Sequence, residues 1–327
     1  MIAVPALVYT VGAYGFFALP YTIIVYPFVF MVMPVLWKRA KDFGYVTAGD
    51  VVHGQYGSRG LELAVAATGV IATMPYIALQ LVGMTAVLKG LGLHGELPLA
   101  IAFIVLALYT YSAGLRAPAL IAFVQDIMIY IVVIAAVALI PSKLGGYGNV
   151  FASADAAFQA KGSGNLLLGG NQYVAYATLA LGSALAAFMY RQTLTGIFAS
   201  NSGNTIRKNA VLLPAYTLLL GLLALPTQFA LDLQLLGGIW ILQTLPALVF
   251  GLYTNWFRAP ALLAGWFVGF FGGTYLVWDA GWKPLHLVAI GDVSFTMYTG
   301  LLALAANILI AVVLNLLTAK RSVSTAH

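Results

Sequence analysis

The stretch from Ala113 to Ile140, AGLRAPALIAFVQDIMIYIVVIAAVALI, is an apolar run long enough to cross a lipid bilayer. A hydrocarbon core of about 30 Å needs about 20 apolar residues of helix. One carboxylate, Asp126, lies about nine residues into the run, or about 14 Å along the helix axis. A carboxylate near mid-membrane is costly and normally faces a bundle interior or a wet cavity, so we predict a gating or proton-linked role for Asp126. A structural pair with a neighbouring polar group is the alternative.

The composition of the whole chain agrees with a multi-spanning membrane protein. Hydrophobic residues make up 62% of the 327 positions and charged residues only 7%, whereas soluble domains carry about 25% charge. The net charge of +6 comes from residues between the apolar runs. Because these charges form no continuous basic face, nucleic acid is not an expected partner. The absence of cysteine excludes disulfides and thiolate metal sites.

Hydropathy predicts an all-α polytopic membrane bundle of about nine or ten segments. These are a short segment at Ile2–Val11 and spans at about Phe16–Trp37, Leu61–Leu88, Leu97–Ala113, Ala117–Ile140, Gln172–Tyr190, Asn209–Leu225, Phe229–Trp256, Ala259–Trp278 and Ser294–Thr318. Arginine and lysine gather in alternate loops, which indicates a multi-pass cell-membrane protein with a cytoplasmic C-terminus. Pro141–Asn171 is predicted to be an external loop with a short surface helix at Ser153–Ala160.

No pattern in the sequence supports an enzyme or a resident cofactor. There is no HExxH, GxSxG or P-loop motif. The histidines are isolated, and His53, His94 and His286 fall in predicted loops. The sequence therefore offers no metal-ligand set, and the metal question stays open.

Polar groups and helix breakers inside the apolar spans point instead to transport. Interrupted helices at mid-membrane expose backbone groups to ions and anionic solutes in transporters. The residues of this kind include Pro75, Tyr76, Gln80, Thr178, Ser183 and Gln243. Each has a structural alternative, because a proline can simply kink a span and a glutamine can link two helices by hydrogen bonds. Gly265, Gly269 and Gly273 form two GxxxG spacings, which favour close helix packing.

Several motifs resemble those of the sodium:solute symporter family, in particular its monocarboxylate permease branch. TYSAGLRAPALIAFVQD resembles the turn between the fourth and fifth core helices. Three further stretches, TMPYIALQLVG, TLTGIFASNSGNTIRKNAVLLPAYTLLLG and FALDLQLLGGIWILQTLPALVFGLY, resemble the third, sixth-to-seventh and tenth core-helix regions. The resemblance implies a LeuT-type fold of two inverted five-helix repeats. On this basis we divide one transmembrane domain, 1–327, into first-repeat helices (1–140), an external loop (141–171), a partial second repeat (172–256) and two extra helices (257–320).

The chain also departs from the family pattern. Ala122 stands where most members have an acid, and Arg191 and Gln192 stand where the branch often has Pro-His. Met1–Val11 resembles only the outer half of the first core helix. A second break falls near Leu225–Thr227, where the eighth core helix and most of the ninth are absent. Ligands for a coupling ion therefore cannot be carried over to this sequence.

The resemblance implies alternating-access transport of a small monocarboxylate such as lactate, pyruvate or acetate, coupled to sodium or protons. A midplane site would be lined by the third, sixth and tenth core helices, which makes five residues the substrate-facing candidates: Tyr76, Gln80, Thr178, Ser183 and Gln243. The expected partners are a small organic anion and the lipid bilayer, and the sequence does not indicate an oligomeric state. A second hypothesis is a shortened, transport-inactive relative that serves as an assembly partner or is a degenerate product.

Overall fold

A computed structural model describes residues 11–113, 116–222, 230–291 and 293–324. The chain divides into two compact units that interleave along the sequence. Unit 1 consists of Met1–Phe16, Ile77–Leu167 and Leu219–Leu231, and unit 2 consists of Phe17–Tyr76, Leu168–Leu218 and Asp232–His327. The predicted segment Ile2–Val11 and the predicted break near Leu225–Thr227 lie almost wholly outside the described residues.

Unit 1 is built from helices and one short bridge. Its helices are the second half of α5 (Arg59–Gly90), α6 (Leu97–Ala113), α7 (Arg116–Lys143) and α8 (Tyr147–Lys161). The helix α8 confirms the surface helix predicted at Ser153–Ala160 and begins six residues earlier. The backbone of Gly12, which has a positive φ of 66°, forms an isolated bridge with Asn165. A side chain at Gly12 would overlap the Asn165 backbone, so this bridge needs glycine.

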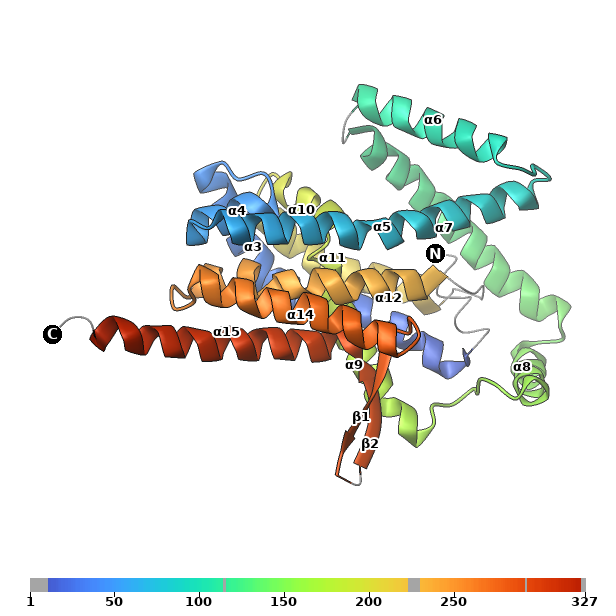
Figure 1. The fold of residues 1–327 in the computed structure, drawn as a ribbon. Coiled ribbons are helices and arrows are strands. Elements are labelled where there is room, and N and C mark those ends of the chain that lie inside the picture. The colour runs from blue at the N-terminus through green and yellow to red at the C-terminus, as the bar shows by residue number, and fades with distance from the viewer. Residues whose placement is uncertain (1–10, 114–115, 223–229, 292, 325–327) are drawn as a thin grey trace. The chain divides into compact units, whose positions relative to one another are not determined.

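Unit 2 contains most of the elements of the chain (Figure 1). They are α2 (Tyr21–Ile24), α3 (Tyr26–Phe43), α4 (Ala48–Tyr56), the first half of α5, η2 (Gly170–Gln172), α9 (Tyr173–Ala187), α10 (Arg191–Phe198), most of α11 (Gly203–Leu222) and of α12 (Ala230–Ile241), η3 (Leu242–Thr244), η4 (Pro246–Phe250), α13 (Gly251–Tyr253), α14 (Ala259–Asp279), β1 (Leu285–Ile290), β2 (Val293–Tyr298) and α15 (Thr299–Ser324). The helix η1 (Ala13–Ala18) crosses the boundary between the units.

The predicted all-α polytopic bundle is confirmed. Six helices of the described chain are long and apolar enough to span a membrane, and the bent pair Gly170–Ala187 and Arg191–Phe198 makes a seventh if counted as one span. This number of spans is below the predicted nine or ten because two predicted spans do not qualify. The helix at Leu97–Ser112 is too short by this criterion, and α11 begins with the polar residues GNTIRKN. The LeuT-type repeat itself stays a prediction.

A two-stranded hairpin precedes the last span and corrects two expectations. Strand β1 pairs with β2 in antiparallel register, Leu285 opposite Tyr298 and Ile290 opposite Val293. The last helix therefore begins at Thr299 and not at the predicted Ser294, because the preceding residues pair as a strand. His286 lies in β1, and His53 lies in α4, so the loop predicted for each of these histidines is wrong.

The helices α14 and α15 pack closely within unit 2 and run side by side (Figure 1). A methyl group at Gly265 would overlap the Asn307 carbonyl, and one at Gly273 would lie 3.0 Å from Ala303. The predicted glycine spacing thus serves close packing within the chain, since small residues let helix backbones approach. Tyr298, fully buried, donates its hydroxyl to the Leu235 carbonyl at 2.7 Å.

The loops predicted to be cytoplasmic meet at one end of unit 2. Trp37 donates its indole N–H to the Ser200 carbonyl at 2.7 Å, and Arg39 donates to the Gly251 carbonyl at 2.9 Å. Gln55 in α4 donates to Asn255, and the Arg258 N–H donates to Asn315 in α15. Trp37, Arg39 and Gln55 thus contact residues more than 150 positions further along the chain.

Candidate functional site

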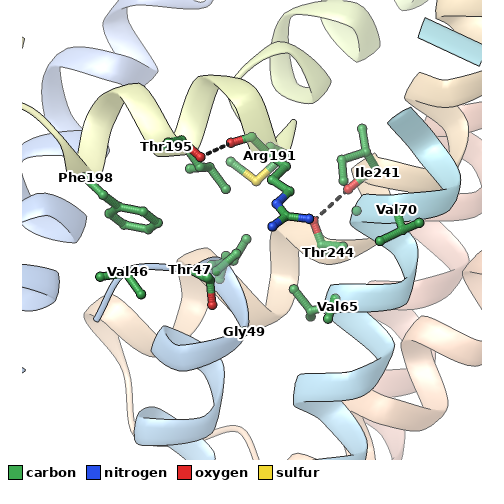
Figure 2. Close-up of a pocket in the computed structure, with 16 residues that line it drawn as sticks. Val46, Thr47, Gly49, Val65, Val70, Arg191, Thr195, Phe198, Ile241 and Thr244 are labelled. Carbon is green, nitrogen blue, oxygen red and sulfur yellow. Dashed lines mark hydrogen bonds between the residues drawn. The ribbon is translucent and has the colours of Figure 1, made fainter. Parts of the chain in front are cut away.

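A cavity of about 370 Å³ lies within unit 2 and is lined by four segments far apart in sequence. Its volume falls in the range of small-molecule sites, about 300–1,000 Å³. The lining residues come from the start of α4, from α5, from α10 and the turn before it, and from the irregular helical segment 241–248 (Figure 2). They are Val46, Thr47, Ala48, Gly49, Val65, Ala66, Gly69, Val70, Met189, Arg191, Leu194, Thr195, Phe198, Ile241, Thr244 and Leu248.

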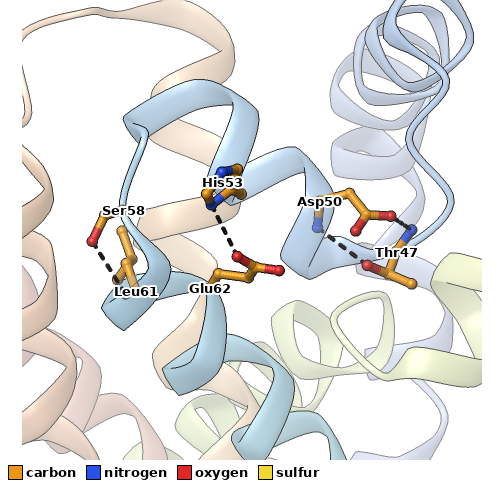
Figure 3. Close-up of polar contacts among 6 residues, drawn as sticks. All are labelled: Thr47, Asp50, His53, Ser58, Leu61 and Glu62. Carbon is orange, nitrogen blue, oxygen red and sulfur yellow. Dashed lines mark hydrogen bonds and ion pairs between the residues drawn. The ribbon is translucent and has the colours of Figure 1, made fainter.

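A capping box fixes the first segment of this lining. The Asp50 N–H donates to the Thr47 hydroxyl at 3.1 Å, and the Asp50 carboxylate accepts from the Thr47 N–H at 2.8 Å (Figure 3). Such reciprocal bonds satisfy orphan donors and define where a helix begins. The Val46 N–H donates to the same carboxylate at 3.0 Å. As a result Val46 and Thr47 are held against the cavity.

Electrostatics reinforces this cap. Partial burial alone would raise the pKa of Asp50, but the N–H groups of Val46 and Thr47, the Thr47 hydroxyl and the charge of His53 together hold the pKa of this carboxyl below its ordinary value. Hydrogen bonds to the charged form lower a carboxyl pKa in this way. His53 Nδ1 also lies 2.9 Å from Glu62 Oε2, which links α4 to α5 (Figure 3).

A bend between α9 and α10 positions the only charged side chain of the lining, Arg191. The two helices meet at 48°, and Tyr190, between them, has an extended backbone with ψ of 139°. Arg191 is the first residue of α10, and its side chain extends into the cavity (Figure 2). Within the described part of the chain, no carboxylate pairs with this guanidinium, since the ion pair found there joins His53 and Glu62.

The fourth segment belongs to the predicted span Phe229–Trp256, and its helix changes hydrogen-bonding pattern twice. The α-helix α12 ends at Ile241, a 3₁₀ turn covers Leu242–Thr244, and a π-helical turn covers Pro246–Phe250. Thr244 is buried, and its hydroxyl donates to the Ile241 carbonyl at 2.7 Å. Irregular turns of this kind often occur at functional sites in helices.

The structure places the predicted site residues of unit 2 outside this cavity. Tyr76 lies near Tyr190, with ring centroids 6.3 Å apart. The Thr178 hydroxyl accepts from the Tyr298 N–H at 3.0 Å, and the Ser183 hydroxyl is buried without a hydrogen-bond partner among the described residues. Gln243 is buried, and its side-chain amide donates to the Ile239 carbonyl at 2.9 Å. Their proposed contacts with substrate stay predictions.

The other two candidates lie in unit 1. Gln80 is exposed on α5, and Asp126 is half-buried on α7. None of the residues in the apolar window of Ile121–Lys143 that could span a membrane is buried in the structure. Asp126 makes no ion pair with a described residue. No group of three or more His, Asp or Glu side chains suited to a metal ion occurs among the described residues.

Comparison with known proteins identifies the family. The model of the sodium:solute symporter family matches residues 1–235. The chain belongs to this family. A monocarboxylate transport permease protein of Rhizobium johnstonii is similar to it, with 70% identity over 422 residues, 99% of this chain and 86% of the permease. The family and this relative indicate a transporter and not an enzyme.

Two more distant members of the symporter family come from Bacillus subtilis, and both are uncharacterized symporters. YodF is 30% identical over 65% of this chain and 43% of its own length, and YhjB is 27% identical over 69% and 46%. The chain thus spans less than half the length of these two relatives. No solved structure matches it.

The match to the permease supports the predicted internal gap. It extends over 422 aligned residues, whereas this symporter-family chain has 327, so roughly 95 aligned positions have no counterpart here. The sequence predicts such a gap near Leu225–Thr227, outside the described residues.

Sequence reasoning missed the cavity residues Arg191, Thr244 and Thr47 as site candidates. Arg191 carried one signal, because it departs from the Pro-His of the monocarboxylate permease branch. Thr47 and Asp50 are three residues apart and just before an apolar pair, which is the spacing of a capping box. No sequence signal joins these positions to Thr244, because only the fold brings residue 244 to residues 47 and 191.

Proposed function

We propose that this protein is a secondary active transporter of small monocarboxylates such as lactate, pyruvate or acetate. Membership of the symporter family and the similarity to a monocarboxylate permease over 99% of the chain support this proposal. The coupling ion is sodium or a proton. The protein would lie in the cell membrane with its C-terminus in the cytoplasm, in agreement with the basic residues of the predicted internal loops.

Alternating access is the mechanism that this architecture favours. A solute site near the midplane, between helices that are interrupted there, becomes accessible from each side in turn. In unit 2, the helix of the predicted span Phe229–Trp256 changes to a 3₁₀ turn at Leu242–Thr244, near the middle of that span. Tyr76, Gln80, Thr178, Ser183 and Gln243 remain the candidates for contacts with the solute.

Uptake into proteoliposomes tests this function. The purified full chain would be reconstituted, and entry of radiolabelled pyruvate, lactate and acetate followed with an inward sodium gradient, an inward proton gradient or neither. We expect accumulation that depends on one gradient, and competition among the three acids. Empty liposomes provide the background. Uptake no faster than this background under all gradients would contradict the proposal and support a transport-inactive relative.

Asp126 is proposed to act in gating or proton linkage. The substitution Asp126→Asn keeps the size of the side chain but removes its charge. We expect it to abolish gradient-driven uptake while leaving the amount of protein in the membrane unchanged. Asp155→Asn, on the surface helix α8, is the matched control and should transport as the wild type does. Unchanged uptake by Asp126→Asn would remove the assignment.

A further inference from the structure

Arg191 brings a charged guanidinium to the lining of this cavity. Arginine presents five N–H donors in a planar fork and remains charged at all physiological pH values. Here the fork extends into the cavity without a carboxylate partner among the described residues (Figure 2). Arg191 is itself exposed, so its guanidinium is accessible to a ligand that enters the cavity.

The hydroxyl groups that line the cavity use their hydrogens within the protein, so Arg191 is the side chain that can donate hydrogen bonds to a ligand. The Thr195 hydroxyl donates to the Arg191 carbonyl at 2.9 Å, and the Thr244 hydroxyl donates to the Ile241 carbonyl at 2.7 Å. Since each hydroxyl has a single hydrogen, these two groups face the cavity as acceptors. The Thr47 hydroxyl accepts from the Asp50 N–H and is also hydrogen-bonded to the Asp50 carboxyl, to which it alone can donate. A ligand here must therefore accept hydrogen bonds from the guanidinium.

The other lining residues indicate which chemical groups the ligand has besides its hydrogen-bond acceptors. Most of the other lining side chains are apolar: Val46, Val65, Val70, Leu194, Phe198, Ile241 and Leu248 among them. A fully polar anion such as phosphate would lose hydration against this wall without replacing it. A short aliphatic chain would instead gain from burial there. The chemistry thus favours an anion with one carboxylate and a small apolar part.

We propose that this cavity binds a short-chain monocarboxylate, with the carboxylate on the Arg191 guanidinium and the alkyl end against the apolar wall. That this ligand is also the transported solute depends on the proposed function. The cavity does not depend on it, because all the lining residues belong to unit 2. It lies beside the loops predicted to be cytoplasmic, so we assign it to the solute on that side of the membrane.

Equilibrium binding to the purified, detergent-solubilised full chain tests this site. Radiolabelled propionate is the probe, and unlabelled propionate, propionamide and inorganic phosphate are the competitors. We expect propionate to compete, and neither the neutral amide nor phosphate to do so at equal concentration. Equal competition by propionamide would overturn the role of the charge. Equal competition by phosphate would overturn the assignment to carboxylates.

Substitutions of Arg191 test how much the guanidinium contributes to propionate affinity. Arg191→Gln should weaken propionate binding by about 10- to 100-fold, the loss typical of a charge-assisted hydrogen bond. Arg191→Lys should retain part of the affinity because it keeps the charge but loses the bidentate fork. Arg59→Gln, at an exposed position outside the cavity, is the matched control and should bind normally. Wild-type affinity in a folded Arg191→Gln protein would overturn the proposal.

A second variant tests the cavity without touching Arg191. Gly69 lines the cavity, and a Cβ added there would meet no heavy atom within 4 Å. Gly69→Leu should therefore fold and fill part of the space, so that butyrate binding falls more than acetate binding. Gly69→Ala should bind both acids as the wild type does. Unchanged butyrate binding by Gly69→Leu would place the ligand elsewhere.

The results of the binding and uptake experiments distinguish an error in the proposed site from an error in the proposed function. Uptake that persists with an unchanged Michaelis constant in Arg191→Gln would overturn the site and leave the transport function standing. Arg191-dependent binding without any uptake by the wild type would keep the site and overturn the transport function.

Discussion

The side-chain amide of Asn307 donates to the backbone carbonyl of Gln243 at 3.0 Å and to Gln243 Oε1 at 3.2 Å. Both residues are about 1% exposed. The backbone carbonyl of Gln243 lies in the 3₁₀ turn of the fourth segment of the cavity wall. Asn307 on α15 thus satisfies an acceptor in this turn. An unpaired carbonyl in an apolar interior is costly, so this contact stabilises the 3₁₀ turn.

Removal of the Asn307 amide should destabilise the protein. Asn307→Leu has a similar size but leaves the carbonyl and Oε1 of Gln243 without this donor, which costs about 1–3 kcal/mol for a buried group. The measurement is thermal unfolding in detergent, followed by the fluorescence of the six tryptophans. Leu309→Ala, at a side chain 61% exposed on the same helix, is the control. Equal melting temperatures for Asn307→Leu and the wild type would contradict the argument.

Two glycines of α14 provide a matched test of the helix contact. A methyl group at Gly269 would overlap Gln243 Oε1 and lie 2.9 Å from Asn307 Cβ and 3.0 Å from the Ala303 carbonyl, whereas one at Gly272 would meet nothing within 4 Å. Gly269→Ala should lower the melting temperature, because α14 and α15 must separate. Gly272→Ala should be neutral or stabilising, by up to about 1 kcal/mol from helix propensity. The reverse order of the two variants would show that the helices do not pack here.

The sequence predicts those features that depend on local composition. Apolar length alone predicted the positions of α5 and α14 and most of α15, and Gly265, Gly269 and Gly273 predicted a close helix contact. The sequence analysis missed the hairpin before Thr299, because the predicted last span begins at Ser294, within the residues of strand β2. The partner of the glycines could not be predicted, since GxxxG spacing does not tell which helix approaches.

The cavity depends on the fold and was not predictable from single segments. Thr47, Arg191 and Thr244 are separated by 144 and 53 positions in the sequence. Each stands in an ordinary local context: a helix cap, a helix start and a buried turn. Polar residues within the spans were singled out for their depth in the membrane, but depth does not determine which face of a helix a side chain occupies.

The cap of α4 should depend on pH. Because the pKa of Asp50 is lowered in the folded protein, its contribution to stability is present above the unfolded value of about 3.9 and is lost as the pH falls through the folded value. Asp50→Asn should melt below the wild type at pH 7, and the difference should shrink below about pH 4. Asp155→Asn controls for the loss of one surface carboxylate. A difference that stays constant from pH 7 to pH 3 would contradict this role of the Asp50 charge.

The absence of cysteine allows a direct test of membrane orientation. The exposed residues Lys41, after the first basic cluster, and Ala157, on α8, lie in segments predicted to be on opposite sides. In intact cells, a membrane-impermeant maleimide should label Ala157→Cys but not Lys41→Cys. Permeabilisation should make both cysteines reactive, and the cysteine-free parent should remain unlabelled throughout. Labelling of Lys41→Cys in intact cells would invert the orientation, and with it the assignment of the Arg191 cavity to the cytoplasmic side.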